Sequence, residues 1–351
     1  MKRLKSLLIA VCAVAVTVAG LTGGTSSAAP SSAALSIVPK KTYTVEPGKT
    51  VDDTLLIRNI DSNKPLELSL RVVDFTFEDD GGTPKLMLAE DAPQTAWSVK
   101  PYLTVPKNVT IPANGSKTLD MSVAIPKTVG GGSYYSAIVY SSGASDGGNV
   151  GLSASGVTLV FANVPGDIKE DLKLEHFGAY HREGTGGKYV FFATTKEPET
   201  MAYTLKNSGN VTEAPVGSIT LRHIFGKEYK IDNVNPNNSL ALIGQSRTFA
   251  PCIKLEQEKV KFNGASSESK TCSTAGLWPG LYTAKLDLFY GQNGSQTKEI
   301  VDSTWFFYLP WWFILVSILV LLFVGYYAWR FYQKIRNKLY GPKMKKTVKR
   351  K

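Results

Sequence analysis

Histidine and cysteine are scarce in this chain, which has 3 of each among 351 residues. The histidines are His176, His181 and His223; none forms an H-E-x-x-H motif or a cluster with cysteine, which excludes the common zinc patterns. No phosphate-binding glycine loop and no nucleophile–base pattern is present. The sequence therefore predicts no metal, no cofactor and no catalytic residue. We expect His176 and His181 at the surface and His223 partly buried in a strand.

Two short motifs are better explained as turns than as sites. Gly143–Gly147 matches the G-x-S-x-G pattern of a nucleophile elbow, but a strand-like run follows it where that motif needs a helix. We interpret it as part of a hairpin loop, Ser141–Gly151. The acidic run Glu78–Asp80 lacks the regular oxygen spacing of a calcium loop and is interpreted as a solvated turn.

Acidic residues are missing from both ends of the chain. Residues 1–29 hold three of the 40 lysines and arginines and residues 303–351 hold ten, with no acid in either stretch. That leaves 27 basic against 29 acidic residues in the middle, so the formal charge of +11 belongs to the ends. A near-neutral middle argues against nucleic-acid binding.

The N-terminal residues 1–34 are predicted to be a secretory signal peptide. A basic start is followed by an apolar run from Leu7 to Ala19 and then by small residues. Cleavage after Ala28 or after Ala34 satisfies the small-x-small rule, whereas Pro30 disfavours cleavage after Ala29. Cys12 lies early in the apolar run and is interpreted as a signal-peptide residue.

The C-terminus holds the strongest signal, a transmembrane helix predicted over residues 305–329. The stretch from Trp311 to Trp329 has no charge, and as a helix it is about 28 Å long, close to the bilayer core. Aromatic residues mark its two rims: Trp305, Trp311 and Trp312 at one, and Tyr326, Tyr327, Trp329 and Tyr332 at the other. The basic tail, residues 330–351, predicts a cytoplasmic C-terminus, hence a single-pass type I protein of the plasma membrane whose helix and tail contact lipid.

Helical periodicity is almost absent between these ends. Apolar and polar residues alternate instead, as in Leu66–Val72 and Leu119–Ile125, which is typical of half-buried strands. After Val72 the alternation slips by one residue, which predicts a β-bulge. Strands at this spacing, separated by Gly, Pro, Asn and Asp turns, favour an antiparallel sandwich and an all-β fold class.

The order of the predicted elements recurs after about a hundred residues. The segment Thr54–Asn59, a polar turn and a strand from Leu66 correspond to Tyr203–Asn207, a polar turn and a strand from Ser218. The later strands match in the same way. We therefore predict two β-sandwich domains, residues 35–164 and 168–303, with the boundary at Pro165–Asp167.

The first domain resembles the N-terminal immunoglobulin-like domain of bacterial WxL-interacting cell-surface proteins. The residues that carry the resemblance are turn and strand residues: Leu35–Pro39, Pro47-Gly48, Arg58-Asn59, Val105-Pro106, Ile111-Pro112 before Asn114-Gly115, and Ile125-Pro126 before Gly130–Gly132. The resemblance implies immunoglobulin-like sandwiches and a non-enzymatic bacterial surface protein that binds a cell-wall polymer or another surface protein. The second domain matches poorly.

Cys252 and Cys272 are the two cysteines that remain after signal removal, and both lie in the exported part. An even number of cysteines in an oxidising compartment predicts a disulfide, although two reduced thiols are the alternative.

Three function classes follow from these features. A tethered binding protein is the main hypothesis, an accessory subunit of a membrane transport or secretion complex is the second, and an enzyme is the third. The membrane segment contains only Ser317 and Gly325 as small polar or flexible positions, which gives little support to the second.

Overall fold

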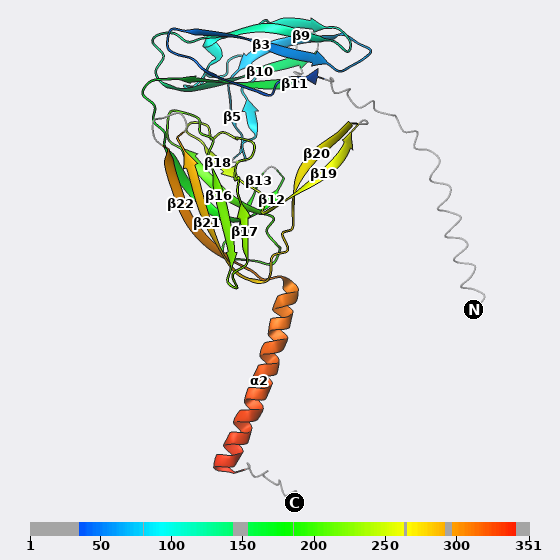
Figure 1. Ribbon diagram of the computed structural model, residues 1–351, viewed down its shortest axis with the longest axis vertical. Coiled ribbons are helices and arrows are strands. Elements are labelled where there is room, and N and C mark those ends of the chain that lie inside the picture. Colours follow the sequence, from blue (N-terminus) through cyan, green and yellow to red (C-terminus); the bar gives the residue numbers. More distant parts are fainter. Residues whose placement is uncertain are drawn as a thin grey trace, which may run out of the picture.

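The computed structural model describes residues 35–79, 81–142, 154–184, 186–262, 265–291 and 297–341. Figure 1 shows two β-sandwiches, one above the other, and a single long helix below them. The fold class is all-β, with two immunoglobulin-like antiparallel sandwiches followed by an apolar C-terminal helix, as the sequence predicted.

The first sandwich packs a four-stranded sheet, in the order β1-β3-β9-β7, on a five-stranded sheet, β2-β11-β10-β4-β8. Its core is built from alternate residues of these strands, such as Leu55, Met121 and Ile138. The bounds are β1 Leu35–Ser36, β2 Lys40–Thr44, β3 Thr50–Asn59, β4 Leu66–Val73, β7 Leu103–Thr104, β8 Asn108–Ile111, β9 Ser116–Ala124, β10 Gly132–Ser142 and β11 Ala154–Val164, with the short helix η1 at Lys100–Tyr102.

The second sandwich packs the sheet β13-β12-β15-β18 on the sheet β14-β22-β21-β16-β17. Tyr203, Tyr282 and Phe306 are large, fully buried side chains of its core. The bounds are β12 Leu172–Glu183, β13 Gly186–Tyr189, β14 Ala193–Thr194, β15 Thr200–Asn207, β16 Val216–His223, β17 Glu228–Ile231, β18 Ser246–Phe249, β21 Gly280–Tyr290 and β22 Lys298–Tyr308. A separate hairpin, β19 Lys254–Phe262 with β20 Ala265–Ser273, projects from this sandwich.

Both sandwiches have the same strand order in their five-stranded sheets, so the recurrence predicted from the sequence is confirmed. In each, the last strand pairs antiparallel with the strand before it and parallel with a short early strand: β11 with β10 and β2, and β22 with β21 and β14. The antiparallel pairing of β10 with β11 also confirms that Ser141–Gly151 joins the two strands of a hairpin. Residues 143–153 of that loop, with the G-x-S-x-G motif, lie outside the described residues.

The bulge predicted after Val72 is wrong. The register between β4 and β10 runs without a shift from Leu68 to Val73, and the chain then leaves the sheet at Asp74 to form a hairpin of β5 Phe75–Phe77 and β6 Pro84–Leu86. Buried Asp74 accepts hydrogen bonds from Ser98 Oγ (2.6 Å), Ser136 Oγ (2.9 Å) and the N–H of Thr95 (2.8 Å). The apolar period changes because the chain departs from the sheet here.

The helix α2 spans Trp311–Tyr340, which corrects the predicted range of residues 305–329. Trp305 belongs to β22, which pairs with β21 as far as Tyr308, so the second sandwich also extends beyond the predicted end at residue 303. At the other end the helix continues through Arg330, Lys334 and Lys338, since Lys and Arg favour a helix as well as apolar residues do. A soluble fragment must therefore reach Tyr308 to keep β22 whole, and Leu309 to keep its hydrogen bond to Thr194.

Candidate binding surface and membrane anchor

The three histidines lie apart from one another and make ordinary contacts. His176 is exposed beside Tyr189, and His181 is half-buried, with Nε2 at 2.9 Å from Thr194 Oγ1. His223 lies in the sheet, as expected, but it is buried more fully than predicted and packs on Tyr282. Among the described residues no group of three or more His, Cys, Asp or Glu side chains is placed to hold a metal. The turn at Asp79 is closed by hydrogen bonds within the turn, which the N–H and the hydroxyl of Thr83 donate to the Asp79 carboxylate.

The two sandwiches are joined by a buried apolar cluster that we call the junction. The first sandwich contributes Val73, Phe75, Tyr135, Ala137, Val139 and Phe161, and the second contributes Leu242 and Ile243. The edge of the junction is polar: the N–H of Phe77 donates to Gln245 Oε1 (3.1 Å), and the Arg247 guanidinium lies 4.7 Å from the centre of the Phe77 ring. Burial lowers the pKa of Arg247 to about 10.

Close backbone contact completes the junction beside the connection between the sandwiches. A side chain on Gly131 would meet the Cα of Gly166 at 2.8 Å, so both positions have room only for glycine. Asn210 donates from Nδ2 to the carbonyls of Gly131 (3.1 Å) and Asp167 (2.8 Å), and its own carbonyl accepts from the N–H of Ser133 (2.9 Å). These contacts fix the orientation of one sandwich on the other.

The sheet farthest from α2 carries an open strand edge with a hollow beside it, which we call the distal notch. Strand β9 pairs with β3 along its whole length, but on its other side β7 covers only Ser122 and Val123. Within the described residues, the edge from Ser116 to Met121 has no ladder partner on that side. The hollow is lined by Asp52, Asp53, Thr54, Thr104, Asp120, Met121 and Ser122.

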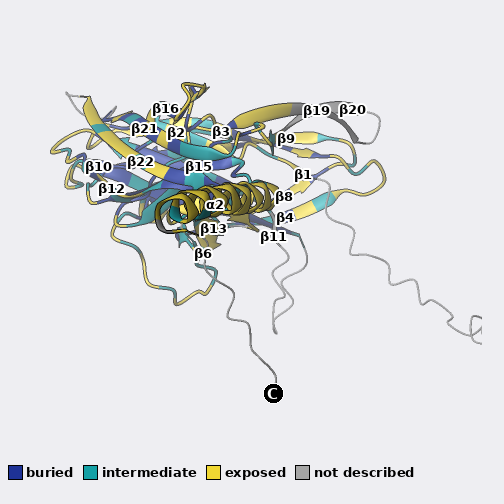
Figure 2. Cartoon of the chain, turned by 90° about the horizontal axis from the view of Figure 1, so that it is seen from below, coloured by how far each residue is buried: buried dark blue, intermediate teal, exposed yellow. Residues whose placement is uncertain are grey.

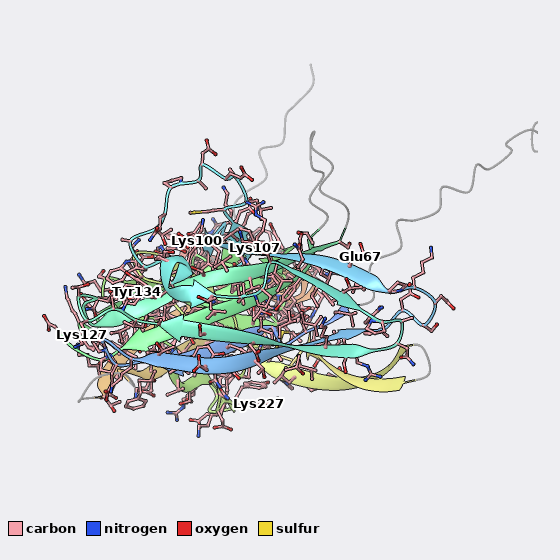
Figure 3. The ribbon with its side chains drawn as sticks, turned by 90° about the horizontal axis from the view of Figure 1, so that it is seen from above. Glu67, Lys100, Lys107, Lys127, Tyr134 and Lys227 are labelled. Carbon is pink, nitrogen blue, oxygen red and sulfur yellow. A yellow bond between two sulfur atoms is a disulfide. The ribbon has the colours of Figure 1, made fainter. Side chains whose placement is uncertain are left out.

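The distal notch faces away from the helix and from the second sandwich. In Figure 1, β3 and β9 form the top layer, above β10 and β11. Figure 3 shows this end from above, with the exposed lysines Lys100 and Lys107 labelled. An unpaired edge presents free N–H and C=O groups that a strand of another chain can pair with. The acidic and hydroxyl lining can hydrogen-bond a polar ligand.

A charged clamp holds the wall of the distal notch in place. Asp53 of β3 accepts hydrogen bonds from Lys41 Nζ (2.5 Å) and Tyr43 Oη (2.6 Å), both on β2 of the opposite sheet. These bonds and the N–H of Thr54 hold the pKa of Asp53 at about 2. The clamp therefore joins the two sheets at their edge wherever Asp53 is ionised, which its low pKa extends to acidic pH.

Two carboxyl groups are buried together at the end of the second sandwich nearest the junction. Glu213 and Glu170 are both almost fully buried. Glu213 Oε2 accepts from the N–H of Gly291 (3.3 Å), and Lys298 Nζ donates to the carbonyl of Glu170. Burial first, and then the neighbouring Glu170, raise the pKa of Glu213 to about 7. Glu213 therefore carries a proton over part of the physiological pH range.

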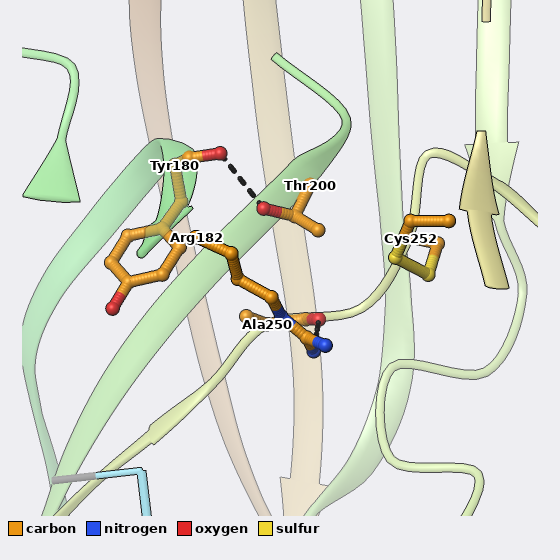
Figure 4. The surroundings of a disulfide bond; sticks show 6 residues. Tyr180, Arg182, Thr200, Ala250 and Cys252 are labelled. Carbon is orange, nitrogen blue, oxygen red and sulfur yellow. Dashed lines mark hydrogen bonds between the residues drawn. A yellow bond between two sulfur atoms is a disulfide. The ribbon is translucent and has the colours of Figure 1, made fainter. Parts of the chain in front are cut away.

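Cys252 and Cys272 form a disulfide with their Cα atoms 5.2 Å apart. The bond lies at the base of the β19–β20 hairpin, where Leu255 pairs with Cys272. Figure 4 shows Cys252 beside two hydrogen bonds of the sandwich, from Thr200 Oγ1 to the carbonyl of Tyr180 (2.8 Å) and from Arg182 Nη2 to that of Ala250 (2.7 Å). The disulfide thus attaches the hairpin to the sandwich.

The helix α2 is long and apolar enough to cross a membrane, with a mean hydropathy of 2.1, and none of its apolar window is buried in the protein. Figure 2 shows it exposed along its length. Trp311 and Trp312 occupy its first turn; Tyr326, Tyr327 and Trp329 lie just before the first charge, Arg330. From Trp311 to Trp329 the helix rises about 27 Å, which is close to the thickness of the hydrocarbon core of a bilayer.

The sequence analysis missed the junction and the distal notch. The signal for the junction was present: β10 contains the uninterrupted apolar run Ala137–Tyr140 and β11 contains the run Leu159–Ala162, and such continuous runs indicate strands buried on both faces. No local signal marks the notch, because it depends on how far β7 runs beside β9.

No protein-family model matches this chain, and no curated protein matches its sequence. Among solved structures, it is similar in fold to a class 5 fimbriae chaperone, with 12% identity, 76% of this chain and 98% of the other covered, and a TM-score of 0.34. It is similar to an Escherichia coli chaperone, DraB (13%, 78% and 96%, 0.30), and to a structure of a Salmonella enterica pilin with its SafB chaperone (9%, 76% and 96%, 0.31). At these scores the likeness says nothing about ligand or partner.

Glu213→Gln should remove a pH dependence of stability. Because the folded pKa of Glu213 is raised above the unfolded value of 4.5, its contribution is fully present below pH 4.5 and is lost as the pH rises through about 7. The variant should therefore gain up to about 3 kcal/mol over the wild type between pH 4.5 and pH 8. Urea unfolding of residues 35–309 across this range measures it, with exposed Glu175→Gln as control. Parallel curves for Glu213→Gln and wild type would contradict the assignment.

The oxidised state of Cys252 and Cys272 can be tested by thiol labelling. Residues 35–309, isolated without reductant and then denatured, should contain no free thiol. Replacing both cysteines by serine should destabilise the second sandwich by about 3 kcal/mol, the chain-entropy value for a loop of this size. Two labelled cysteines before reduction would show that the bond does not form in the cell.

Proposed function

We propose that the chain is a single-pass, membrane-anchored protein of the bacterial cell surface that binds another surface protein and catalyses no reaction. Residues up to the region 28–34 would be removed as a signal peptide, the sandwiches would lie outside the plasma membrane, and residues after Arg330 would lie inside. A cell-wall polymer is the alternative ligand.

The observation that carries this proposal is the direct continuation of β22 into α2. Only Leu309 and Pro310 separate the strand from the helix, and the N–H of Leu309 donates to the carbonyl of Thr194 (2.8 Å). Pro310 is buried and its ring suits the position before a helix. A membrane helix joined this closely to a two-sandwich unit supports a tether that keeps the ectodomain near the membrane surface and raises its concentration for a partner held there.

The distal notch is the surface that best suits binding. It lies at the opposite end of the described ectodomain from the helix (Figure 1), so a partner would meet it without hindrance from the bilayer. Its open β9 edge favours a partner that adds an extended strand, hence a protein. The loop at Gly143–Gly151, rich in Gly, Ser and Asn, is a further candidate contact surface, but it lies outside the described residues.

The resemblance to WxL-interacting proteins belongs to the same proposal. The sequence motifs cover the first sandwich alone, whereas the strand order extends the immunoglobulin-like plan to the second. This common plan supports membership of that group, and a partner among exported surface proteins agrees with what the resemblance implies.

The proposed topology predicts the result of proteolysis on wall-stripped cells. Added protease should remove the ectodomain and leave a membrane-protected fragment that carries the basic tail, because residues after Arg330 are inside. An antibody to an epitope placed after Lys351 detects the fragment. Protection of the ectodomain in intact cells, with digestion only after lysis, would reverse the orientation.

Photo-crosslinking tests the distal notch. A photoreactive amino acid at Thr118, on the open edge of β9, should give a discrete adduct in the native envelope, whereas the same residue at Thr283 should give none. Thr283 is also exposed, but both edges of its strand, β21, are paired. Ser122→Arg, which fills the hollow, should abolish the adduct. An adduct removed by wall hydrolases would identify a polymer; equal adducts from Thr118 and Thr283 would refute a specific edge, and an adduct with a transporter would favour an accessory subunit.

A further inference from the structure

The exposed aromatic side chains of the ectodomain are concentrated at one end of it. Among the described residues before α2, the Phe and Trp side chains that are more than half exposed are Phe191 (92%), Phe192 (55%), Phe225 (87%), Trp278 (67%) and Trp305 (54%). Ile224, next to Phe225, is 63% exposed. Exposed aromatics of this kind cost solubility, so a cluster of them indicates a contact surface.

Backbone pairing brings these residues together from four separate segments. The N–H of Phe307 donates to the carbonyl of Phe192 (2.8 Å), Phe307 pairs with Leu281, and the N–H of Ile224 donates to the carbonyl of Leu281 (3.0 Å). The four residues therefore form one row across the end of the five-stranded sheet. Trp278 precedes Gly280, which pairs with Tyr308, so it lies at the same end. We call Phe191, Phe192, Ile224, Phe225 and Trp278 the aromatic collar.

The collar lies at the end of the sandwich from which α2 leaves. Phe307 is four residues before Trp311, the first helical residue, and the hydrogen bond between Leu309 and Thr194 keeps the segment that carries Phe191 and Phe192 beside the start of the helix. Figure 1 shows the ends of β16, β17, β21 and β22 meeting just above α2, and Figure 2 views this end from below.

We propose that the aromatic collar inserts into the interface of the same bilayer that α2 spans, so that the second sandwich rests on the membrane. The proposal rests on the proposed function in one respect, that α2 is a membrane helix. Trp311 and Trp312 would then sit at the headgroup level, where Trp is favoured, and the row through Phe307 lies only four residues before Trp311 in the chain. Phe and Trp at loop ends contribute apolar area to such an interface, and exposed Lys227, two residues after Phe225, can meet lipid phosphates.

A bilayer is a better partner for the aromatic collar than a protein, because the collar lies directly beside the start of the membrane helix. The collar consists of side chains from separate turns near the first residues of α2. Because these turns lie at the same end of the sandwich, their side chains can enter the membrane interface at a similar depth. A protein partner would have to share that position with the lipid headgroups. Contact at several points around the helix would also prevent the ectodomain from tilting on its two-residue connection.

Fluorescence quenching in vesicles tests the proposal on the full mature chain. Single cysteines at Phe225 and Phe191 are labelled with an environment-sensitive fluorophore, and the protein is reconstituted in phosphatidylcholine vesicles with or without lipids that carry a quencher near the headgroup. Both labels should lose fluorescence in the quencher vesicles. A label at Phe289, which is 40% exposed at the opposite end of β21, should not. Wild type, with its disulfide intact, controls for labelling.

A label at Leu319, in the middle of α2, separates this proposal from the one it rests on. Leu319 should be quenched by lipids that carry the quencher deep in the acyl chains; if it is not, the membrane helix itself is wrong. If Leu319 is quenched but Phe225 and Phe191 respond like Phe289, the collar does not touch the bilayer and the proposal is refuted while the anchor stands. A blue-shifted label that no lipid quencher reaches would also refute it, because a protein would then cover the collar.

Discussion

The arrangement of this molecule depends on one constraint: strands β10 and β11 are apolar on both faces. One face of each strand contributes to the core of the first sandwich, as Ile138 and Val160 do, and the other carries Ala137, Val139 and Phe161 into the junction. A sheet with two apolar faces must be covered on both. Leu242 and Ile243 of the second sandwich supply the second cover, so the two sandwiches bury a cluster in common.

This shared cluster makes the two sandwiches one unit from the start of α2 to the distal notch. The helix continues β22, β22 contributes Phe306 to the second core, and the second sandwich is fixed to the first through the junction. Under the proposed function, a partner at β9 would act on a body that is rigidly continuous with the start of α2. Inserted aromatic side chains at the collar would define that direction further, since a helix alone leaves the attached domain free to tilt.

Polar groups buried around the junction add specificity at a cost in stability. Asp74, with its hydrogen bonds from Ser98, Ser136 and Thr95, fixes the point at which the chain leaves β4 and sends Phe75 to the second sandwich. Glu213 remains partly unionised because its surroundings do not compensate a charge. The guanidinium of Arg247 lies 4.7 Å from the centre of the Phe77 ring and 5.4 Å from that of Phe249, and these cation–π contacts offset part of the cost of burying its charge. Such groups favour a single mutual orientation of the sandwiches.

The sequence by itself determined the strands, the class of fold and the helix. Alternation over Leu119–Ile125 was enough to assign an inward face, because the period of a strand is two residues, and an uncharged run of 19 residues was enough to assign a membrane-length helix. The order of the strands determines three further features: what covers an apolar face, how far a neighbouring strand extends, and which distant turns lie at the same end of a sheet. The junction, the distal notch and the collar depend on these, and Phe191, Phe225 and Trp278 are isolated aromatics in turns until β14, β16 and β21 place them together. Only the tertiary structure could decide them, since pairing between strands far apart in the chain leaves no periodic trace in the sequence.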